Sequence, residues 1–229
     1  MMLSFSNNGR GIYVSVYYHE LKIQNNNCTN NEYGIQVSDL GNGFSGIIEN
    51  NRCNNNIQAG ISVVNAHYVK ITNNILLNNY VYGIAISANY CNITGNEIED
   101  NGVHGIDVDG SDYCFIFEND ITGSQRGINM RDSEYNQIFH NNIVESNSYG
   151  ILIFDTANFN RIYLNNFIDN CLVYPSQQEA ADDGLGNNFF DITSLRGNYW
   201  SDWVGFGTYA INGDANSIDL YPQGVTISW

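Results

Sequence analysis

Residues 83–101 read GIAISANYCNITGNEIEDN, and this stretch decides the fold because its pattern recurs through most of the chain. Each copy opens with Gly and Ile, continues through a polar turn, and closes with regularly spaced Ile and Asn residues. The opening glycines recur every 22 to 26 residues, at Gly11, Gly34, Gly60, Gly83, Gly105, Gly127 and Gly150. A column of asparagines keeps nearly the same period, at Asn26, Asn51, Asn74, Asn96, Asn119, Asn141 and Asn165. Two independent columns with one period indicate a solenoid of stacked repeats.

Within each repeat, apolar and polar residues alternate, which is the period of a β-strand rather than of a helix. Ile84 and Ile86 mark a first strand, and Ile93 and Ile98 mark a second and a third. Three short strands in 22–23 residues leave no room for the longer arm of a leucine-rich repeat. The sequence therefore predicts an all-β fold, a right-handed parallel β-helix of about seven coils with three short strands in each coil.

The repeated asparagine has a structural explanation. Asn tolerates the left-handed backbone conformation that a tight bend between two strands requires. Identical amides that stack one coil apart, about 4.8 Å, can also form a hydrogen-bonded ladder along the solenoid axis. We therefore interpret the asparagine column as part of the scaffold and not as a ligand site.

The five cysteines show no spacing that is typical of a metal site. Cys28 and Cys53 fall in one inward column, Cys91 and Cys114 share another, and Cys171 stands alone. Adjacent coils bring each pair close together, so disulfides and free thiols are both compatible with the pattern. Because disulfide geometry is demanding, we favour buried thiols that act as small apolar residues.

The composition limits the partners of the protein. The formal net charge is −16 and the sequence pI is about 4.2, which argues against nucleic acid and anionic membrane surfaces. No apolar run reaches the length of about 18 residues that a membrane helix needs, so no membrane insertion is expected. We expect an extracellular or cell-surface location, although the opening residues carry no signal peptide.

The two ends of the chain depart from the repeat. We assign the coils to residues 1–171, and an insertion and cap to 172–229, within one domain. Residues 1–8 resemble the third strand of a coil whose first two strands are missing, so we expect the chain to be part of a longer polypeptide. The tryptophans all follow residue 171, and large aromatic side chains suit a plug over the open end of a coil stack.

The repeats, with GNYWSDW at 197–203 and a tail that ends near Tyr221 and Pro222, resemble the periplasmic copper-binding repeat family of right-handed β-helix proteins. That family belongs to a larger group of carbohydrate-binding proteins and sugar hydrolases. The resemblance covers nearly the whole chain and implies a β-helix with a role in carbohydrate recognition. Copper itself is not expected, because copper needs clusters of His, Met or Cys. The histidines are scattered, at His19, His67, His104 and His140.

The tail of that family usually resembles an oxygen-rich calcium loop. Here the corresponding residues, 212–219, read NGDANSID, without one carboxylate and the second glycine of that loop. The resemblance implies Asp214, Asn216 and Asp219 as calcium ligands, and no other cofactor is expected. An Asx-rich turn is the alternative interpretation of the same residues.

Charged residues interrupt the repeat at one place on the predicted outer surface. The outward positions of the first strand bring Asp107, Asp109 and Arg131 together on neighbouring coils. Two carboxylates and an arginine can serve a polysaccharide lyase or a glycoside hydrolase. The other interpretation is a surface ion pair between Asp109 and Arg131, which we favour. Whether the protein is an enzyme stays open, and we lean towards a protein without catalysis.

A binding function would use aromatic side chains. Tyr33, Tyr82 and Tyr149 each precede a repeat glycine, and Asn129 lies at an outward position of the same strand column. Tyrosine rings on a rigid face can stack on sugars, while the alternative role is to cover strand edges. The sequence favours a non-catalytic scaffold module of a secreted or cell-surface protein that binds carbohydrate. A polysaccharide-active enzyme is the alternative.

Overall fold

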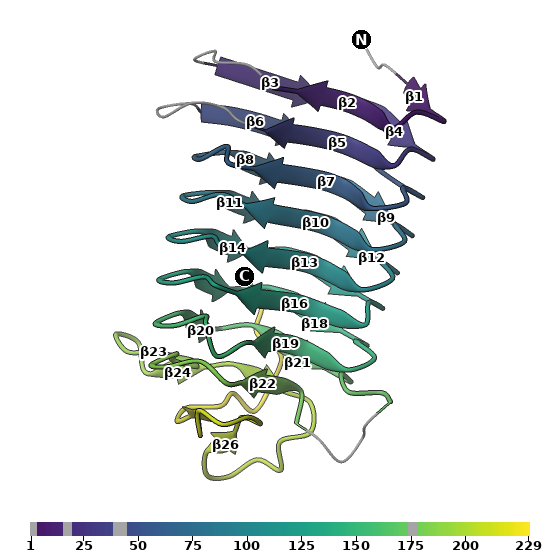
Figure 1. Ribbon diagram of the computed structural model, residues 1–229. Coiled ribbons are helices and arrows are strands. Elements are labelled where there is room, and N and C mark those ends of the chain that lie inside the picture. The colour runs from purple at the N-terminus through teal and green to yellow at the C-terminus, as the bar shows by residue number, and fades with distance from the viewer. Residues whose placement is uncertain (1–3, 16–19, 39–44, 174–177) are drawn as a thin grey trace.

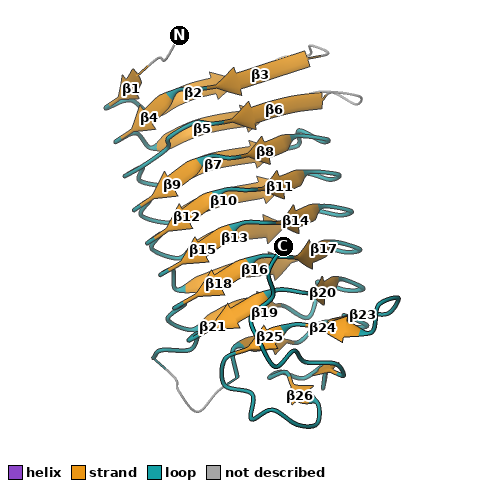
Figure 2. Ribbon diagram, turned by 180° about the vertical axis from the view of Figure 1, so that it is seen from behind, coloured by secondary structure: helices purple, strands orange, loops and turns teal. Residues whose placement is uncertain are grey.

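The computed structural model describes residues 4–15, 20–38, 45–173 and 178–229. These residues form strands and turns, with no helix among them. The chain winds into a stack of coils whose corresponding strands lie side by side (Figure 1), and the view from behind shows the same stacking on the far side (Figure 2). The predicted right-handed parallel β-helix is confirmed.

Three parallel sheets form the walls of the solenoid. The eight-stranded sheet contains β2 (Arg10–Val14), β5 (Tyr33–Ser38), β7 (Ala59–Val64), β10 (Tyr82–Ser87), β13 (His104–Asp109), β16 (Arg126–Arg131), β19 (Tyr149–Ile153) and β22 (Ala180–Asp182). The seven-stranded sheet contains β3 (Glu20–Gln24), β6 (Ser45–Glu49), β8 (Lys70–Thr72), β11 (Asn92–Thr94), β14 (Phe115–Phe117), β17 (Gln137–Phe139) and β20 (Arg161–Tyr163). The six-stranded sheet contains β9 (Ile75–Leu77), β12 (Glu97–Glu99), β15 (Asp120–Thr122), β18 (Asn142–Val144), β21 (Asn166–Ile168) and β25 (Tyr199–Trp200).

Three two-stranded sheets lie at the ends of the stack. They are β1 (Ser4–Ser6) with β4 (Asn27–Thr29), β23 (Phe190–Asp191) with β24 (Arg196–Gly197), and β26 (Tyr209–Ala210) with β27 (Ile218–Asp219). The first pair is parallel and the other two pairs are antiparallel. Because β22 and β25 extend two of the large sheets, the segment after Cys171 supplies further strands to the stack before it forms the cap.

The bore of the solenoid is filled by the apolar columns that the sequence predicts. Ile84 pairs in register with Ile61 and Ile106, and all three side chains are fully buried. The repeat glycine is required for space: a Cβ on Gly83 would lie 2.6 Å from the carbonyl oxygen of Gly105. The glycine column therefore allows adjacent coils to approach closely where each coil enters the eight-stranded sheet.

The predicted asparagine ladder is present. The Nδ2 of Asn96 donates to the Oδ1 of Asn119 at 2.9 Å, and its backbone N–H donates to the same oxygen at 3.0 Å. The same bond joins the whole column, Asn26, Asn51, Asn74, Asn96, Asn119, Asn141, Asn165 and Asn198. Each of these amides satisfies buried backbone and side-chain groups at a bend, which is why the column repeats.

One part of the explanation for this column was wrong. The residues with the left-handed backbone are those immediately before the ladder residues, namely Asn25, Asn50, Asn73, Gly95, Glu118, His140 and Leu164. Their φ angles lie between 54° and 65°. The side-chain amide, and not tolerance of a positive φ, is therefore what selects Asn in the ladder itself.

A second ladder follows the next bend and is interrupted. The Nδ2 of Asn56 donates to Asn79 at 2.9 Å, and Asn79 donates to Asn101 in the same way. Ser124 and Ser146 occupy the next two positions, and their buried hydroxyl groups have no partner among the described residues. Serine is too short to continue the amide chain, so two coils lack the bonds that the other coils make.

The cysteines are buried free thiols. Cys91 and Cys114 are neighbours in the bore, and the backbone N–H of Cys91 donates to the Sγ of Cys114 at 3.3 Å. Burial raises the pKa of the Cys53 thiol, and the contact with Cys91, together with burial, raises that of Cys114, because an apolar bore disfavours the thiolate. These side chains therefore pack as small apolar groups.

The GNYWSDW segment forms the cap. The ring of Trp200 stacks between Phe167 and Tyr209, with centroids 4.3 Å from each, and its Nε1 donates to Asp219 at 2.9 Å. Ser201 donates through its N–H and hydroxyl to the Oε1 of Glu179, at 2.9 and 2.6 Å. The motif that marks the family resemblance therefore serves the closure of the coil stack.

The last residues turn back along the outside of the coils, and the view from behind shows the C-terminus near β17 (Figure 2). Asn166 and Ile227 exchange two hydrogen bonds, at 2.9 and 2.7 Å. Trp229 stacks on His140 with centroids 5.4 Å apart. In the part of the chain that the structure describes, no helix has the length and apolarity to span a membrane.

Candidate functional site

The candidate site lies on the outer face of the eight-stranded sheet, across β13 and β16. Along β13, Ile106 and Val108 point into the bore, so the residues between and beside them point outward. The parallel register then places outward residues in rows that cross the strands. Asp107 lies beside Asn129, and Asp109 lies beside Arg131. These side chains are therefore neighbours on the outer face, as the repeat register in the sequence predicts.

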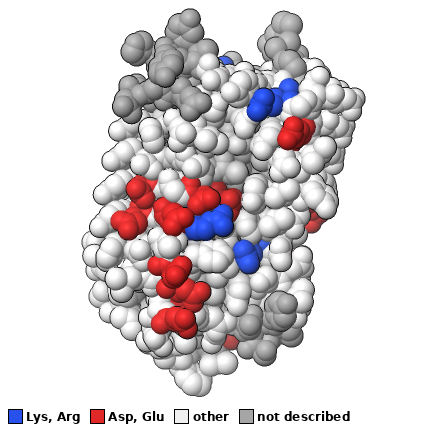
Figure 3. Space-filling view, viewed as in Figure 1, with Lys and Arg blue, Asp and Glu red and all other residues white. Residues whose placement is uncertain are grey.

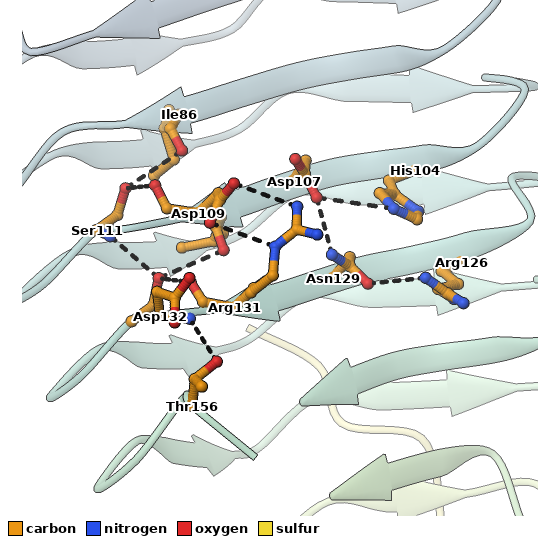
Figure 4. A network of polar contacts seen from close by, with 12 residues as sticks. Ile86, His104, Asp107, Asp109, Ser111, Arg126, Asn129, Arg131, Asp132 and Thr156 are labelled. Carbon is orange, nitrogen blue, oxygen red and sulfur yellow. Dashed lines mark hydrogen bonds and ion pairs between the residues drawn. The ribbon is translucent and has the colours of Figure 1, made fainter. Parts of the chain in front are cut away.

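A chain of hydrogen bonds connects the centre of this face (Figure 4). The Nδ2 of Asn129 donates to the Oδ1 of Asp107 at 2.9 Å, and the Nη1 of Arg126 donates to the Oδ1 of Asn129 at 3.0 Å. Asp107 is only 6% exposed and Asn129 only 1% exposed, although both point away from the bore. Their neighbours shelter them, so they form the floor of the site and the longer side chains form its walls.

The second carboxylate is engaged in an ion pair. The Nε and Nη2 of Arg131 donate to the two oxygens of Asp109, at 3.3 and 3.2 Å, and Figure 4 shows this two-pronged contact. Both side chains are somewhat less than half exposed. The ion pair that the sequence analysis favoured for Asp109 and Arg131 is therefore present in the structure.

Two guanidinium groups converge on one aromatic ring. The Cζ of Arg126 lies 5.8 Å from the ring centroid of Phe154, and the Cζ of Arg131 lies 6.0 Å from the same centroid. Figure 3 shows basic side chains among many acidic ones at mid-height on this face. Such contacts are attractive because the face of an aromatic ring carries negative charge density. Phe154 thus links the two arginines of the site.

The tyrosines proposed for ligand binding lie in one row at the start of the strands. In this row Tyr82 follows Tyr33 two strands later, with Ala59 between them. Tyr149 lies beyond Arg126 in the same row. All three tyrosine rings are partly exposed, and Tyr82 stacks on His104 at a centroid distance of 5.5 Å. Tyr82 and Tyr149 therefore border the polar centre, while Tyr33 lies farther along the face.

Burial controls the protonation of the central groups. Burial, reinforced by the charge of Arg126, lowers the pKa of His104 to about 4. Burial also raises the pKa of Asp107, and the hydrogen bond from Asn129 opposes that rise. The His104 Nε2 lies 3.7 Å from the Oδ1 of Asp107, so near neutral pH this contact joins an uncharged imidazole to the carboxyl group. A carboxyl that holds its proton more tightly is suited to act as a general acid.

The proposed calcium ligands have other contacts. The carboxylate of Asp219 is fully buried and accepts bonds from the backbone of Asn198, the indole of Trp200 and the backbone of Tyr221, at 2.7, 2.9 and 3.0 Å. Asn216 donates to the backbone oxygen of Asp214, as in an Asx-rich turn. Asp219 therefore organises the cap, and its oxygens are already used by three protein donors.

Three members of the site were missing from the sequence-based set. In their coils, His104 and Arg126 stand directly before the repeat glycine, at the position that a tyrosine occupies in other coils. Aligning the coils on that glycine could therefore have identified them. Phe154 follows β19, directly after the strand ends, and the repeat pattern gives no reason to select it. Its role depends on the conformations of the two arginine side chains.

A stacked column of exposed aromatic rings was also missed. Successive ring centroids lie 4.9 to 5.5 Å apart, and each ring is 43% to 47% exposed, for Tyr68, Tyr90, Tyr113, Tyr135 and Phe159. Each residue has a positive φ at a turn of its coil. Because neighbouring rings cover one another's faces, mainly edges and hydroxyl groups reach the solvent. This column therefore lacks the free ring faces that sugar stacking requires.

Comparison with known proteins gives one family and one fold. The family described as "Periplasmic copper-binding protein (NosD)" matches residues 42–205. No curated protein sequence matches the chain. Among solved structures, the full-length tailspike protein 2 from Escherichia coli O157:H7 bacteriophage CAB120 superposes with a TM-score of 0.61 at 16% identity, over 94% of this chain and 33% of the tailspike. The enzymatically active domain of bacteriophage CBA120 tailspike protein 2 gives a TM-score of 0.57 at 15% identity, over 89% and 32%.

At 16% and 15% identity, the similarity to the tailspikes establishes that this chain shares their β-helix fold, and it is no evidence for a shared function. The chain spans about a third of the length of these tailspike structures. The family assignment is secure because the matched region, residues 42–205, covers most of the chain.

The family description names copper, and the described donor groups do not fit that metal. The Nδ1 of His67 accepts a bond from the backbone of Asn89, His104 faces Asp107, and His140 stacks on the C-terminal tryptophan. Across the described ranges, no three His, Cys, Asp or Glu side chains are grouped to hold a metal ion. His19 lies outside the described residues. We therefore assign no copper chemistry to the site.

Proposed function

The chain belongs to the NosD family of periplasmic copper-binding proteins, and we propose that it is a non-catalytic β-helix module that binds carbohydrate on the outer face of its eight-stranded sheet. The periplasm or the cell surface is the proposed location. One observation carries the proposal. A fixed row of donors and acceptors, from Asp107 through Asn129 to Arg126, lies between the rings of Tyr82 and Tyr149.

Sugar rings match such a surface for two reasons. Their hydroxyl groups accept hydrogen bonds, and the partly exposed guanidinium group of Arg126, held from below by Asn129, offers donors to them. Their C–H faces pack on aromatic rings. Because Asn129 is fixed by Asp107 and in turn holds Arg126, that guanidinium group loses little conformational freedom when a ligand binds.

The same geometry argues against catalysis. An acid–base pair needs carboxylates that reach the substrate. Asp109 is held by both prongs of Arg131, and Asp107 is 6% exposed and bonded to Asn129. Neither carboxylate is positioned as a free acid or base. The module therefore presents a surface for recognition.

A polysaccharide-active enzyme is the second candidate. The observation that favours it is the raised pKa of Asp107, which burial produces beside His104. A carboxyl whose pKa is raised keeps its proton to higher pH, so Asp107 could act as a general acid once a substrate displaced the sheltering side chains. Asp107 and Asp109 would then be the catalytic carboxylates, and Arg131 would hold the substrate.

One experiment separates the two functions. The protein is applied to a glycan array, and each glycan that binds is titrated by calorimetry and then incubated to measure reducing ends and unsaturated products. Tyr82→Ala and Tyr149→Ala should each weaken binding by about threefold to tenfold, as expected for the loss of one aromatic contact. Phe115→Ala is the matched control, because this partly exposed ring lies on the outer face of a different sheet.

Binding without product, together with weaker binding by both tyrosine variants, supports the proposal. Product formation that disappears in Asp107→Asn supports the enzyme in its place. Unchanged affinity in both tyrosine variants would show that sugars bind elsewhere or not at all on this face.

A further inference from the structure

We propose that this site selects sugars that carry a carboxylate, and that the guanidinium group of Arg126 binds that carboxylate. The inference rests on the proposed carbohydrate function and names the class of sugar. Uronic acids and other acidic sugars belong to this class. The net charge of −16 argues against an anionic ligand, so the case depends on the local surroundings of Arg126.

Arg126 lacks the partner that an arginine in this protein would be expected to have. The chain contains 24 acidic and 8 basic residues, so carboxylates are abundant. Within the described residues, ion pairs join Lys22 to Glu49, His104 to Asp107, Arg131 to Asp109, and Arg161 to Asp191. None of them includes Arg126. In the described part of the chain, this guanidinium group is partly buried and has no carboxylate at ion-pair distance, although Asp107 is near enough to attract it.

The hydrogen-bonding capacity of Arg126 is also only partly used. Its Nη1 donates to the neutral amide of Asn129, and its Nε is buried without a partner in the described structure. A guanidinium group offers five donors in a planar fork, which matches the two oxygens of a carboxylate. The site therefore holds a partly desolvated cation with donors to spare.

The neighbours of Arg126 compensate its charge only in part, because Asp107 attracts it from the adjacent strand but is hydrogen-bonded to Asn129 and not to the arginine. In its row, His104 and Tyr149 lie on either side, and near neutral pH both are uncharged. Arg131 differs, because its Nε and Nη2 already donate to the two carboxylate oxygens of Asp109. Arg131 is thus paired with Asp109 at one end of β16, while Arg126, at the other end, makes no ion pair among the described residues.

Phe154 completes the arrangement. Its ring lies between the two guanidinium groups, 5.8 Å from the Cζ of Arg126 and 6.0 Å from that of Arg131. A partly exposed ring next to a free guanidinium group offers a sugar ring a stacking surface and its carboxylate an ionic partner. A neutral sugar would use only the first of these contacts.

The test compares oligosaccharides of galacturonate, glucuronate and mannuronate with their methyl esters, which keep the sugar and remove the charge. Calorimetry with the whole chain should show about tenfold tighter binding of the acid form than of the ester for at least one of them. Arg126→Gln should reduce that ratio to about one. Arg161→Gln is the matched control, and it should keep the ratio because that arginine is paired with Asp191 and starts β20, in a different sheet.

Two results would overturn the inference and are distinguishable from failure of the proposed function. If esters and neutral glycans bind as tightly as the acids, the face binds sugars without selecting a carboxylate. If the Arg126→Gln variant still prefers the acid form, a group other than Arg126 binds the carboxylate. Absence of binding by every glycan in both forms would instead remove the proposed function, and this inference with it.

Discussion

The indole Nε1 of Trp200 donates a 2.9 Å hydrogen bond to the carboxylate of Asp219, and both side chains are buried in the cap. We predict that Trp200→Phe lowers the free energy of unfolding by about 3 kcal/mol, because it removes this donor and leaves a cavity between Phe167 and Tyr209. Urea unfolding followed by circular dichroism measures the change.

Trp203 supplies a matched control for this prediction. Its Nε1 is buried without a partner, so Trp203→Phe removes a donor that makes no bond among the described residues. The expected loss of stability is below about 1 kcal/mol. Equal losses in the two variants would show that ring volume, and not the bond to Asp219, determines the stability of the cap.

The interrupted asparagine ladder gives a stabilising prediction. In Ser124→Asn, the new amide oxygen can accept from Asn101, as Asn101 itself accepts from Asn79. We expect the free energy of unfolding to rise by about 1 kcal/mol. Ser133→Asn is the control and should destabilise, because the Ser133 hydroxyl already accepts from the backbone of Ser111 and donates to the carbonyl oxygen of Arg131. A fall in stability for both variants would mean that the second ladder has no room for an amide.

The fold could be predicted because each coil repeats the same structural requirement. Ile106 alone is compatible with a helix or a strand, whereas the same residue type at Ile84 and Ile128 in register indicates a stack of strands. The reason for the ladder asparagines was harder to see. Their side chains and the left-handed residues before them are adjacent in sequence, so a column in the alignment cannot separate the two roles.

The candidate site was predictable only in part. The period places Asp109 beside Arg131 because outward positions follow directly from the register. It does not give the depth of a side chain, so the burial of Asp107 and the approach of two arginines to Phe154 had no sequence signal. In the cap the period is lost, so nothing in the sequence indicated that Asp219 accepts a hydrogen bond from Trp200.

The ion pair on the outer face should contribute little to stability. Asp109 and Arg131 are 43% and 44% exposed at their side chains, so water and salt weaken their attraction. A double-mutant cycle of Asp109→Asn and Arg131→Gln should give a coupling energy below about 1 kcal/mol, and this energy should decrease further in 1 M salt. A coupling of several kcal/mol would mean that the pair is effectively buried and that this face is less open than its exposure suggests.

Buried carboxyl groups should make the protein more stable at mildly acidic pH than at neutral pH. Burial raises the pKa of Asp182 above its ordinary value, against bonds from Ser217, Asn187 and Gly184 that lower it. The folded state therefore holds this proton more tightly than the unfolded state. The resulting stability is fully present below the unfolded pKa and is lost as the pH rises through the folded pKa.

Asp182→Asn tests this dependence with little change of shape. The new amide can donate to the hydroxyl oxygen of Ser217, which now donates to Asp182 at 2.5 Å, while the amide oxygen keeps the bonds from Gly184 and Asn187. Unfolding free energies from pH 4 to pH 8 should fall less steeply in this variant than in the native chain. Glu97→Gln, at an exposed position, is the control. A parallel decline in all three proteins would mean that the general repulsion of a chain with net charge −16, and not Asp182, sets the pH dependence.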